Sequence, residues 1–234
     1  MKKERVQKLI SQAGIASRRK AEELIKEKKV TVNGKIVQLG ELASFEDEIL
    51  VDGIPLYKQE KVYYLINKPE KVICSLNDPQ KRTIITDLID DTRFIFPVGR
   101  LDYNTTGTMI ITNDGELTQR LLHPKYEIKR VYRARLNEPL TKKQLDFLNS
   151  DKVMLEGKQS LQEVKQVDNK SYIITLSVGT YHHIKKLFEL FDLKVQSLNR
   201  IEFAGLSHIG LKKGEYRKMN IKEIRWLKKL VNLI

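Results

Sequence analysis

The sequence predicts an α+β protein with a small N-terminal module and a larger domain built on a largely antiparallel, mixed sheet. Three observations favour this class. Two helical patterns and a hairpin fall within the first sixty residues, strand patterns recur after Val62, and the strands do not alternate regularly with helices. We place the domain boundary between residues 58 and 59, which gives a module at 1–58 and a domain at 59–234.

The N-terminal module opens with two predicted helices. Apolar residues recur at helical spacing over residues 4–14, and Gly14 stands at a usual position for a helix C-cap. A second helix is predicted over 18–29, after Ser17, because serine is a good N-cap. Its first turn carries three positive charges, which oppose the helix dipole and are easier to explain if phosphate neutralises them.

A hairpin and a further strand complete the module. The Asn33-Gly34 pair within 30–37 readily adopts the positive dihedral angles of a two-residue turn. Residues 47–56 supply another strand and turn, and the mixed segment 57–61 is the expected linker. The module therefore has the size and composition of a small RNA-binding unit.

The larger domain shows strand and helix patterns in turn. Apolar, β-branched or alternating segments predict strands, and a 3.6-residue apolar period predicts helices. The predicted strands are 62–67, 108–112, 130–136 and 171–178, and the predicted helices are 114–124, 181–191 and one that buries Ile224, Leu227, Leu230 and Val231.

The net charge of +13 indicates a polyanionic partner, because lysine and arginine release condensed counterions when they neutralise phosphates. Net charge alone is equally consistent with a surface that only maintains solubility. However, residues 1–35 carry 11 basic against 4 acidic residues, whereas 41–60 carry 1 against 6. A charge distributed so unevenly favours a binding face.

Several classes of site and location are excluded by absent patterns. Cys74 is the only cysteine and the four histidines form no HExxH motif, so we expect no disulfide and no metal site. Phosphate-loop, dinucleotide and nucleophile-elbow motifs are missing. No apolar run approaches the roughly 18 residues needed to span a bilayer, and the first residues read as a polar helix. We therefore expect a cytoplasmic protein without a cofactor or membrane partner.

One carboxylate stands out in PVGRLDYNTTGTMIITND, residues 97–114. An aspartate in such a loop is more often a turn residue than a catalyst. Asp102, however, has a cation, an aromatic ring and hydroxyl groups beside it, which suit a sugar-phosphate and a base. An aspartate is ionised at neutral pH, so it could serve as a nucleophile or a base. The neighbours are Arg100, Tyr103, Thr105 and Thr106.

This stretch resembles the signature of the RsuA/RluB/RluE/RluF family of bacterial ribosomal RNA pseudouridine synthases. Residues 5–37 resemble the αL-type RNA-binding domain first described in a small-subunit ribosomal protein. YYLINKP at 63–69 resembles the first motif of the catalytic domain, and the structural alternative for Asn67, Lys68 and Pro69 is that they only shape a turn that braces the active-site loop. Residues 177–203 resemble the last motif, and Leu198 and Arg200 stand at its characteristic end. The four ordered matches cover essentially the whole chain.

The resemblance implies isomerisation of uridine to pseudouridine in ribosomal RNA, without a cofactor. Asp102 matches the essential aspartate, which either attacks the sugar covalently or removes a sugar proton. Tyr132 matches a tyrosine that stacks on the turned-out base, and Lys185 matches the basic residue that pairs with the aspartate. Arg100 resembles an arginine that holds the RNA open where the uridine has left its stack.

The resemblance also implies RNA contacts and some departures from the family. Many members have lysine where Arg130 keeps the charge, and an acidic residue commonly stands where this chain has Val178, which bears on how the helix of Lys185 is braced. His182 and His183 are either rim residues that touch phosphate or polar surface. The expected RNA-binding residues are Arg5, Arg18, Arg19, Lys20, Lys35, Arg100, Tyr103, Thr105, Arg130, His182 and Arg200.

The expected partner is ribosomal RNA or an assembling ribosomal subunit, bound by a monomer. The N-terminal module resembles that of large-subunit enzymes, whereas YHHIKKLF and GEYRKMN resemble the small-subunit enzyme, so both subunits stay open. Two other functions are considered. A non-catalytic assembly factor would not need Asp102, Tyr132 and Lys185 together, and a glycoside hydrolase would need a second acid as proton donor.

Overall fold

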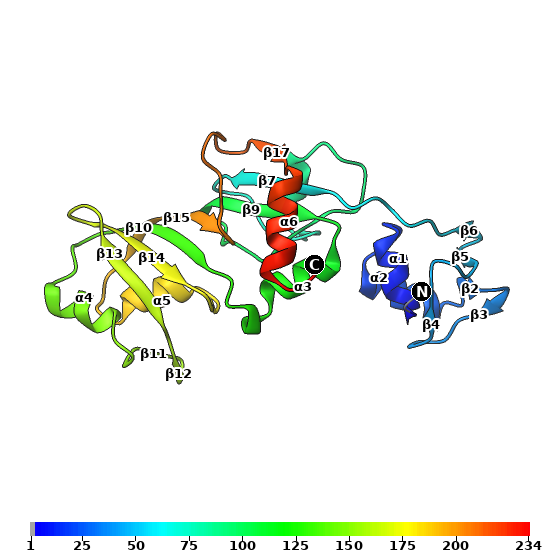
Figure 1. The fold of residues 1–234 in the computed structure, drawn as a ribbon, viewed down its shortest axis with the longest axis horizontal. Helices are drawn as coiled ribbons and strands as arrows, with labels where there is room; N and C mark the ends of the chain where they lie inside the picture. Colours follow the sequence, from blue (N-terminus) through cyan, green and yellow to red (C-terminus); the bar gives the residue numbers. More distant parts are fainter. Residues whose placement is uncertain (1–2) are drawn as a thin grey trace. The chain divides into compact units, whose positions relative to one another are not determined.

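The computed structural model describes residues 3–234, and the chain divides into two compact units. The N-terminal unit runs to Val62 and includes Asp90–Phe96 and Thr112–Gly115. The C-terminal unit comprises Tyr63–Ile89, Pro97–Ile111 and Glu116–Ile234 (Figure 1). Within the described residues, no helix has the length and apolarity that crossing a bilayer requires.

The N-terminal unit packs two helices against short strands. Apolar residues of both helices form one core with residues of the strands, among them Leu9, Ile25 and Val51. One small sheet has the strand order β3-β2-β5-β6, and β1 pairs with β4. The elements are β1 (Glu4–Arg5), α1 (Val6–Gln12), α2 (Arg18–Lys26), β2 (Val30–Val32), β3 (Lys35–Ile36), β4 (Leu42–Ala43), β5 (Ile49–Val51) and β6 (Ile54–Pro55).

Local sequence signals set the limits of these elements as predicted. The Ser17 hydroxyl accepts a hydrogen bond from the backbone N–H of Lys20 and caps α2. Gly14 follows α1 with a φ of 76°, in the left-handed region that ends many helices. Asn33 and Gly34 both have positive φ between β2 and β3, so the predicted hairpin turn is confirmed.

The larger sheet has nine strands, and it is mixed. The main order is β13-β14-β10-β15-β9-β7-β17, with β16 beside β15 and β8 beside β9. β15 pairs with β9 in parallel, whereas β13–β14, β14–β10, β10–β15 and β7–β17 are antiparallel, which confirms the predicted sheet. The strands are β7 (Tyr63–Lys68), β8 (Phe96–Pro97), β9 (Thr106–Thr112), β10 (Arg130–Leu136), β13 (Gln162–Gln166), β14 (Ser171–Leu176), β15 (Val195–Phe203), β16 (Leu206–Ser207) and β17 (Tyr216–Lys218).

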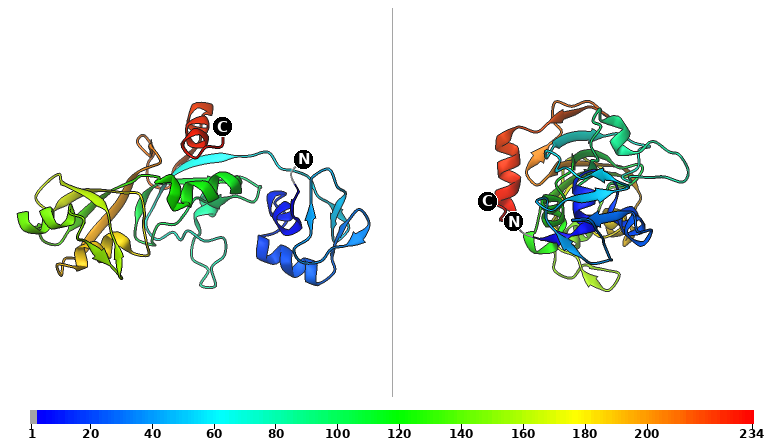
Figure 2. Two further views of the ribbon diagram at one scale, coloured as in Figure 1. Left: turned by 60° about the horizontal axis from the view of Figure 1, so that its bottom comes forward. Right: turned by 90° about the vertical axis from the view of Figure 1, so that its right-hand side faces the viewer.

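Two cores cover this sheet. α5 (His183–Glu189) and α4 (Lys142–Leu148) pack on β10, β13 and β14, while α3 (Gly115–Leu122) and α6 (Ile221–Leu230) pack on β7 and β9 (Figures 1 and 2). The remaining elements are two short 3-10 helices, η1 (Ile85–Leu88) and η2 (Pro124–Tyr126), and the ribbon of β11 (Met154–Leu155) and β12 (Lys158–Gln159).

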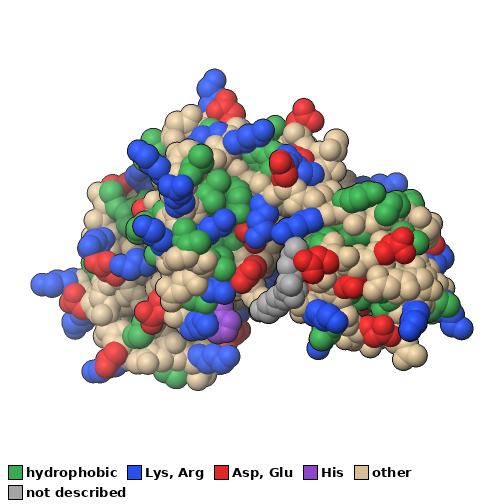
Figure 3. Space-filling view, turned by 45° about the vertical axis from the view of Figure 1, so that its right-hand side comes forward, with side chains coloured by type: hydrophobic (Ala, Val, Ile, Leu, Met, Phe, Trp, Pro, Cys, Tyr) green, Lys and Arg blue, Asp and Glu red, His purple; other side chains and the backbone are tan. Residues whose placement is uncertain are grey.

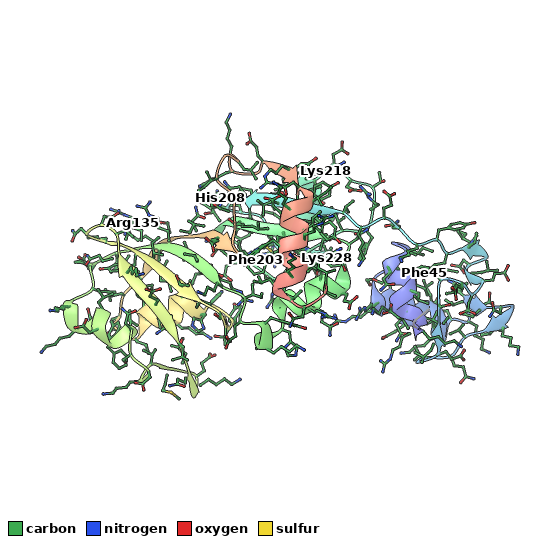
Figure 4. The ribbon with its side chains drawn as sticks, viewed as in Figure 1. Phe45, Arg135, Phe203, His208, Lys218 and Lys228 are labelled. Carbon is green, nitrogen blue, oxygen red and sulfur yellow. The ribbon has the colours of Figure 1, made fainter. Side chains whose placement is uncertain are left out.

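A β-bulge keeps Arg200 and Phe203 on the same face of the sheet. Tyr132 of β10 lies opposite Arg200 of β15, and Arg130 lies opposite Phe203, so one extra residue of β15 fits between these pairs. Since Arg130 and Tyr132 share a face of β10, Arg200 and Phe203 share that face as well. The opposite face of β10 is exposed and carries Arg135, labelled in Figure 4.

Gly107 allows β9 and β15 to approach each other closely. Its φ of 112° is in a region that other residues rarely adopt, and it lies opposite Arg200 in the parallel register. A Cβ atom built at Gly107 would lie 2.3 Å from the carbonyl oxygen of Arg200 and from Oδ1 of Asn199. The parallel contact at the centre of the sheet therefore requires glycine.

We expect Gly107→Ala to lower the free energy of unfolding by about 3 kcal/mol or more, because backbone strain adds to a contact that β15 must move to relieve. Urea unfolding at neutral pH measures this. Gly210→Ala is the matched control, since Gly210 has a φ of 88° with open space around it, and it should cost about 1 kcal/mol. Equal losses in the two variants would contradict the requirement.

Candidate active site

A pocket of about 850 Å³ opens in the C-terminal unit. Its walls come from segments within 73–82, 99–105 and 179–185. Strands β10 and β15 also contribute side chains to its lining. Asp102, Tyr132 and Lys185 all line it, although they are far apart in the sequence. The pocket therefore brings the three predicted catalytic residues together.

The Asp102 carboxylate is held by a lysine. Nζ of Lys185, from α5, donates a hydrogen bond of 2.8 Å to Oδ2 of Asp102. Nε2 of His182 lies 3.6 Å from the same oxygen. The side chains of Lys185 and Asp102 are 31% and 29% exposed, so both are accessible from the pocket. The predicted pairing is confirmed, and the catalytic roles of both residues stay predictions.

The buried ammonium group of Lys68 fixes the loop that carries Asp102. Lys68 is 0% exposed, and its Nζ donates hydrogen bonds to the carbonyl oxygens of Pro69 (3.0 Å), Asp102 (3.1 Å), Tyr103 (3.4 Å) and Thr105 (2.9 Å). Burial lowers the pKa of Lys68, and Cys74 and Asp102 offset part of this shift. Lys68 thus braces the active-site loop, which agrees with the structural alternative considered for this residue.

Further contacts close the same loop. The backbone N–H of Thr105 donates to the carbonyl oxygen of Asp102 at 3.0 Å, and that of Lys71 donates to Tyr103 at 2.9 Å. The N–H of Leu101 points at Sγ of Cys74 at 3.4 Å. Burial raises the pKa of the Cys74 thiol, so it remains protonated and neutral at physiological pH. The Asp102 side chain therefore projects from a rigid backbone.

Tyr132 and Arg200 form the floor of the pocket. Arg200 is only 2% exposed, its Nε donates to the carbonyl oxygen of Thr108 at 2.8 Å, and its guanidinium lies 4.7 Å from the ring centre of Phe203 (labelled in Figure 4). Its Nη2 is buried and has no hydrogen-bond partner among the described residues. Arg200 is therefore too deeply buried to contact phosphate at the surface.

Thr105 and Arg130, which were also predicted to bind RNA, make contacts within the protein. Thr105 is 2% exposed, and its carbonyl group is one of the acceptors of Lys68. The Arg130 guanidinium donates to the carbonyl oxygens of Ile128 and Ser177, and burial lowers its pKa. Arg130 therefore supports the start of the 177–182 loop, which the sequence alone did not indicate.

The remaining predicted RNA-binding residues are exposed or partly exposed. Arg100, Tyr103 and His182 line the pocket. The other five lie in the N-terminal unit, where Lys20 forms an ion pair of 2.9 Å with Glu23. Figure 3 shows basic side chains over much of the visible surface, with acidic ones between them. These five residues are Arg5, Arg18, Arg19, Lys20 and Lys35, all exposed.

His183 differs from both expectations, which placed it at the rim or on a polar surface. It is buried, with Nε2 2.9 Å from Oγ of Ser160 and Nδ1 facing Thr180. Burial lowers its pKa, so it stays neutral at physiological pH. Val178, where an acid is common in the family, is 53% exposed. His183 and Ser160 therefore brace α5 near Lys185.

Comparison with known proteins assigns both parts of the chain. Residues 62–190 match the RNA pseudouridylate synthase family, and residues 4–49 match the S4 domain. Within the described residues, no cluster of histidine, cysteine or acidic side chains could hold a metal ion.

Proteins similar over nearly the full length carry related names. The chain is 39% identical to the ribosomal large subunit pseudouridine synthase B of Bacillus subtilis, over 98% of this chain and 97% of the relative. It is also 39% identical to an uncharacterized RNA pseudouridine synthase of Aquifex aeolicus, over 98% and 95%. A crystal structure of a pseudouridylate synthase superposes with a TM-score of 0.71 at 27% identity, over 95% of this chain and 99% of that one.

We expect Lys68→Met to lower the free energy of unfolding by about 2–4 kcal/mol, because Met fills the space but removes the donor that four carbonyl oxygens share. Urea unfolding measures the loss. The control Lys213→Met removes an ion pair between Lys213 and Glu70, whose side chains are 61% and 52% exposed, respectively. That change should stay within about 0.5 kcal/mol. A Lys68 variant as stable as the control would show that the ammonium does not hold the loop.

Proposed function

We propose that this chain, which belongs to the RNA pseudouridylate synthase family, isomerises a uridine of ribosomal RNA to pseudouridine with Asp102 as the essential residue. The observation that carries the proposal is the contact of 2.8 Å between Lys185 and Asp102 in a pocket that also contains Tyr132. The name of the Bacillus subtilis relative supports the RNA of the large subunit as the substrate class. Both free ribosomal RNA and an assembling ribosomal particle contain uridines of this RNA.

The pocket residues divide the work of the reaction. The uridine must leave its stack before its glycosidic bond can be reached. Asp102 then acts at the sugar, by attack or by removal of a proton, and the hydrogen bond from Lys185 orients the carboxylate. Tyr132 stacks on the uracil while it turns, and Arg200 lies beside Tyr132 in the pocket. Arg100, exposed at the pocket, holds the vacated position in the RNA.

The N-terminal unit supplies affinity in this proposal. The S4 match supports RNA binding by a domain at 1–58, followed by a catalytic domain at 59–234. Its exposed arginine and lysine side chains would contact phosphates and shape rather than bases. We further propose that the protein acts as a cytoplasmic monomer, since all three predicted catalytic residues come from one chain.

Asp102→Asn should abolish catalysis while RNA binding persists. Large-subunit RNA labelled with tritium at C5 of uracil releases the label when the new carbon–carbon bond forms. We expect a loss in rate of roughly a thousandfold or more, because the variant keeps the shape but not the charge. Asp151→Asn, at an exposed aspartate outside the pocket, should react like the wild type. No release by the wild-type protein on RNA that it binds would favour a non-catalytic assembly factor.

RNA affinity should fall steeply with salt. Each phosphate contact that is lost lowers the slope of log K against log salt by about one, so Arg18→Ala with Arg19→Ala should lower it by about two. Fluorescence anisotropy between low and physiological salt measures both slopes. Lys165→Ala, an exposed change on β13, should leave the slope unchanged. A flat wild-type profile would contradict the basic RNA-binding face.

A further inference from the structure

Two tyrosine rings are exposed around the Asp102 carboxylate. Tyr103 directly follows Asp102 and is 39% exposed, and Tyr181 is 66% exposed. Both line the pocket. The Tyr181 ring stacks on His182, with ring centres 3.8 Å apart and an interplanar angle of 18°, and His182 in turn lies 3.6 Å from Asp102. Tyr103 is therefore next to Asp102 in the sequence, and Tyr181 is separated from Asp102 in space by the His182 ring.

Tyr103 is backed by an arginine that is itself held in place. Cζ of Arg82 lies 5.8 Å from the centre of the Tyr103 ring. Asp78 accepts hydrogen bonds from the backbone N–H of Arg82 (2.9 Å), from its Nε (3.0 Å) and from its Nη2 (2.8 Å). The hydrogen bond from the Arg82 side chain is the main cause that lowers the pKa of Asp78 to about 2. The pair is therefore charged at any pH at which the protein is assayed.

Tyr181 has a similar setting on the other wall segment. The His182 ring covers it in parallel, and Nζ of Lys186 lies 5.5 Å from its ring centre. Lys186 forms an ion pair with Glu156, which limits its freedom. Each tyrosine thus presents an aromatic surface next to a fixed cation, a combination that suits a nucleobase and its adjoining phosphate.

We propose that Tyr103 with Arg82, and Tyr181 with His182, are stacking platforms for the two bases that flank the target uridine. This inference rests on the proposed function. When a uridine leaves the stack, each neighbour loses a stacking partner, and an exposed ring beside the pocket replaces it. Because a platform needs an unpaired neighbour, the substrate class is a uridine in a single-stranded loop or bulge rather than in a regular duplex.

The test uses the full-length protein and a single-stranded nine-nucleotide RNA with one central uridine. The fluorescent base 2-aminopurine replaces the base on the 5′ side in one RNA and the base on the 3′ side in another. Tyr103→Ala and Tyr181→Ala should each weaken binding about 5- to 100-fold, and each should change the fluorescence of one labelled position more than the other. The Phe variants keep the ring and should bind like the wild type.

Phe147→Ala is the matched control, because Phe147 is an aromatic residue of the C-terminal unit that is 37% exposed and lies outside the pocket. Unchanged affinity and fluorescence in both Ala variants would overturn the inference, and tritium release by the wild type in the same samples would leave the proposed function intact. Tyrosine-dependent binding of the short RNA, together with no tritium release by the wild type from large-subunit RNA labelled at C5 of uracil, would support the platforms and overturn the proposed function. Equal loss in the Ala and Phe variants would also overturn the inference, since the ring would not be the group that binds.

Discussion

The buried ammonium group of Lys68 is the interaction on which the geometry of the site depends. A charge removed from water is costly unless hydrogen bonds replace its hydration. Here four carbonyl oxygens replace it, and three of them belong to the loop of Asp102. The end of β7 and the start of β9 are therefore joined through a single side chain, and the Asp102 carboxylate is directed toward α5 by backbone that cannot relax independently.

The sheet performs the complementary task of bringing distant residues to one face. Gly107 permits the close parallel contact between β9 and β15, and the bulge in β15 keeps Arg200 aligned with Tyr132. The two hydrophobic cores stabilise separate sets of elements around the pocket. Lys185 comes from α5, which packs in the core with β10, β13 and β14. Asp102 comes from the loop before β9, which belongs to the core with α3 and α6. The active pair thus joins two well-packed halves of one unit.

Sequence patterns predicted what is set locally. The Ser17 cap, the Asn33-Gly34 turn and the alternation of β10 follow from short-range preferences and were confirmed. The patterns did not assign α4, β13 or β17, whose existence depends on packing against the rest of the sheet. They also missed contacts that tertiary structure creates. Examples are the pairing of Arg82 with Tyr103, the stacking of Tyr181 on His182, and the burial of Thr105, His183 and Arg200 among neighbours remote in the chain.

The acidic residues of the pocket distinguish isomerisation from hydrolysis. A two-carboxylate glycosidase needs one acid that is protonated at neutral pH to assist the leaving group. Only Asp78 and Asp102 contribute carboxylates to the described lining of the pocket. Arg82 holds the pKa of Asp78 at about 2, so that group carries no proton to donate, and Asp102 is paired with Lys185. In isomerisation the uracil remains in the site and is attached again, which a single carboxylate can support. The arrangement of charges therefore favours rearrangement of the nucleoside over its cleavage.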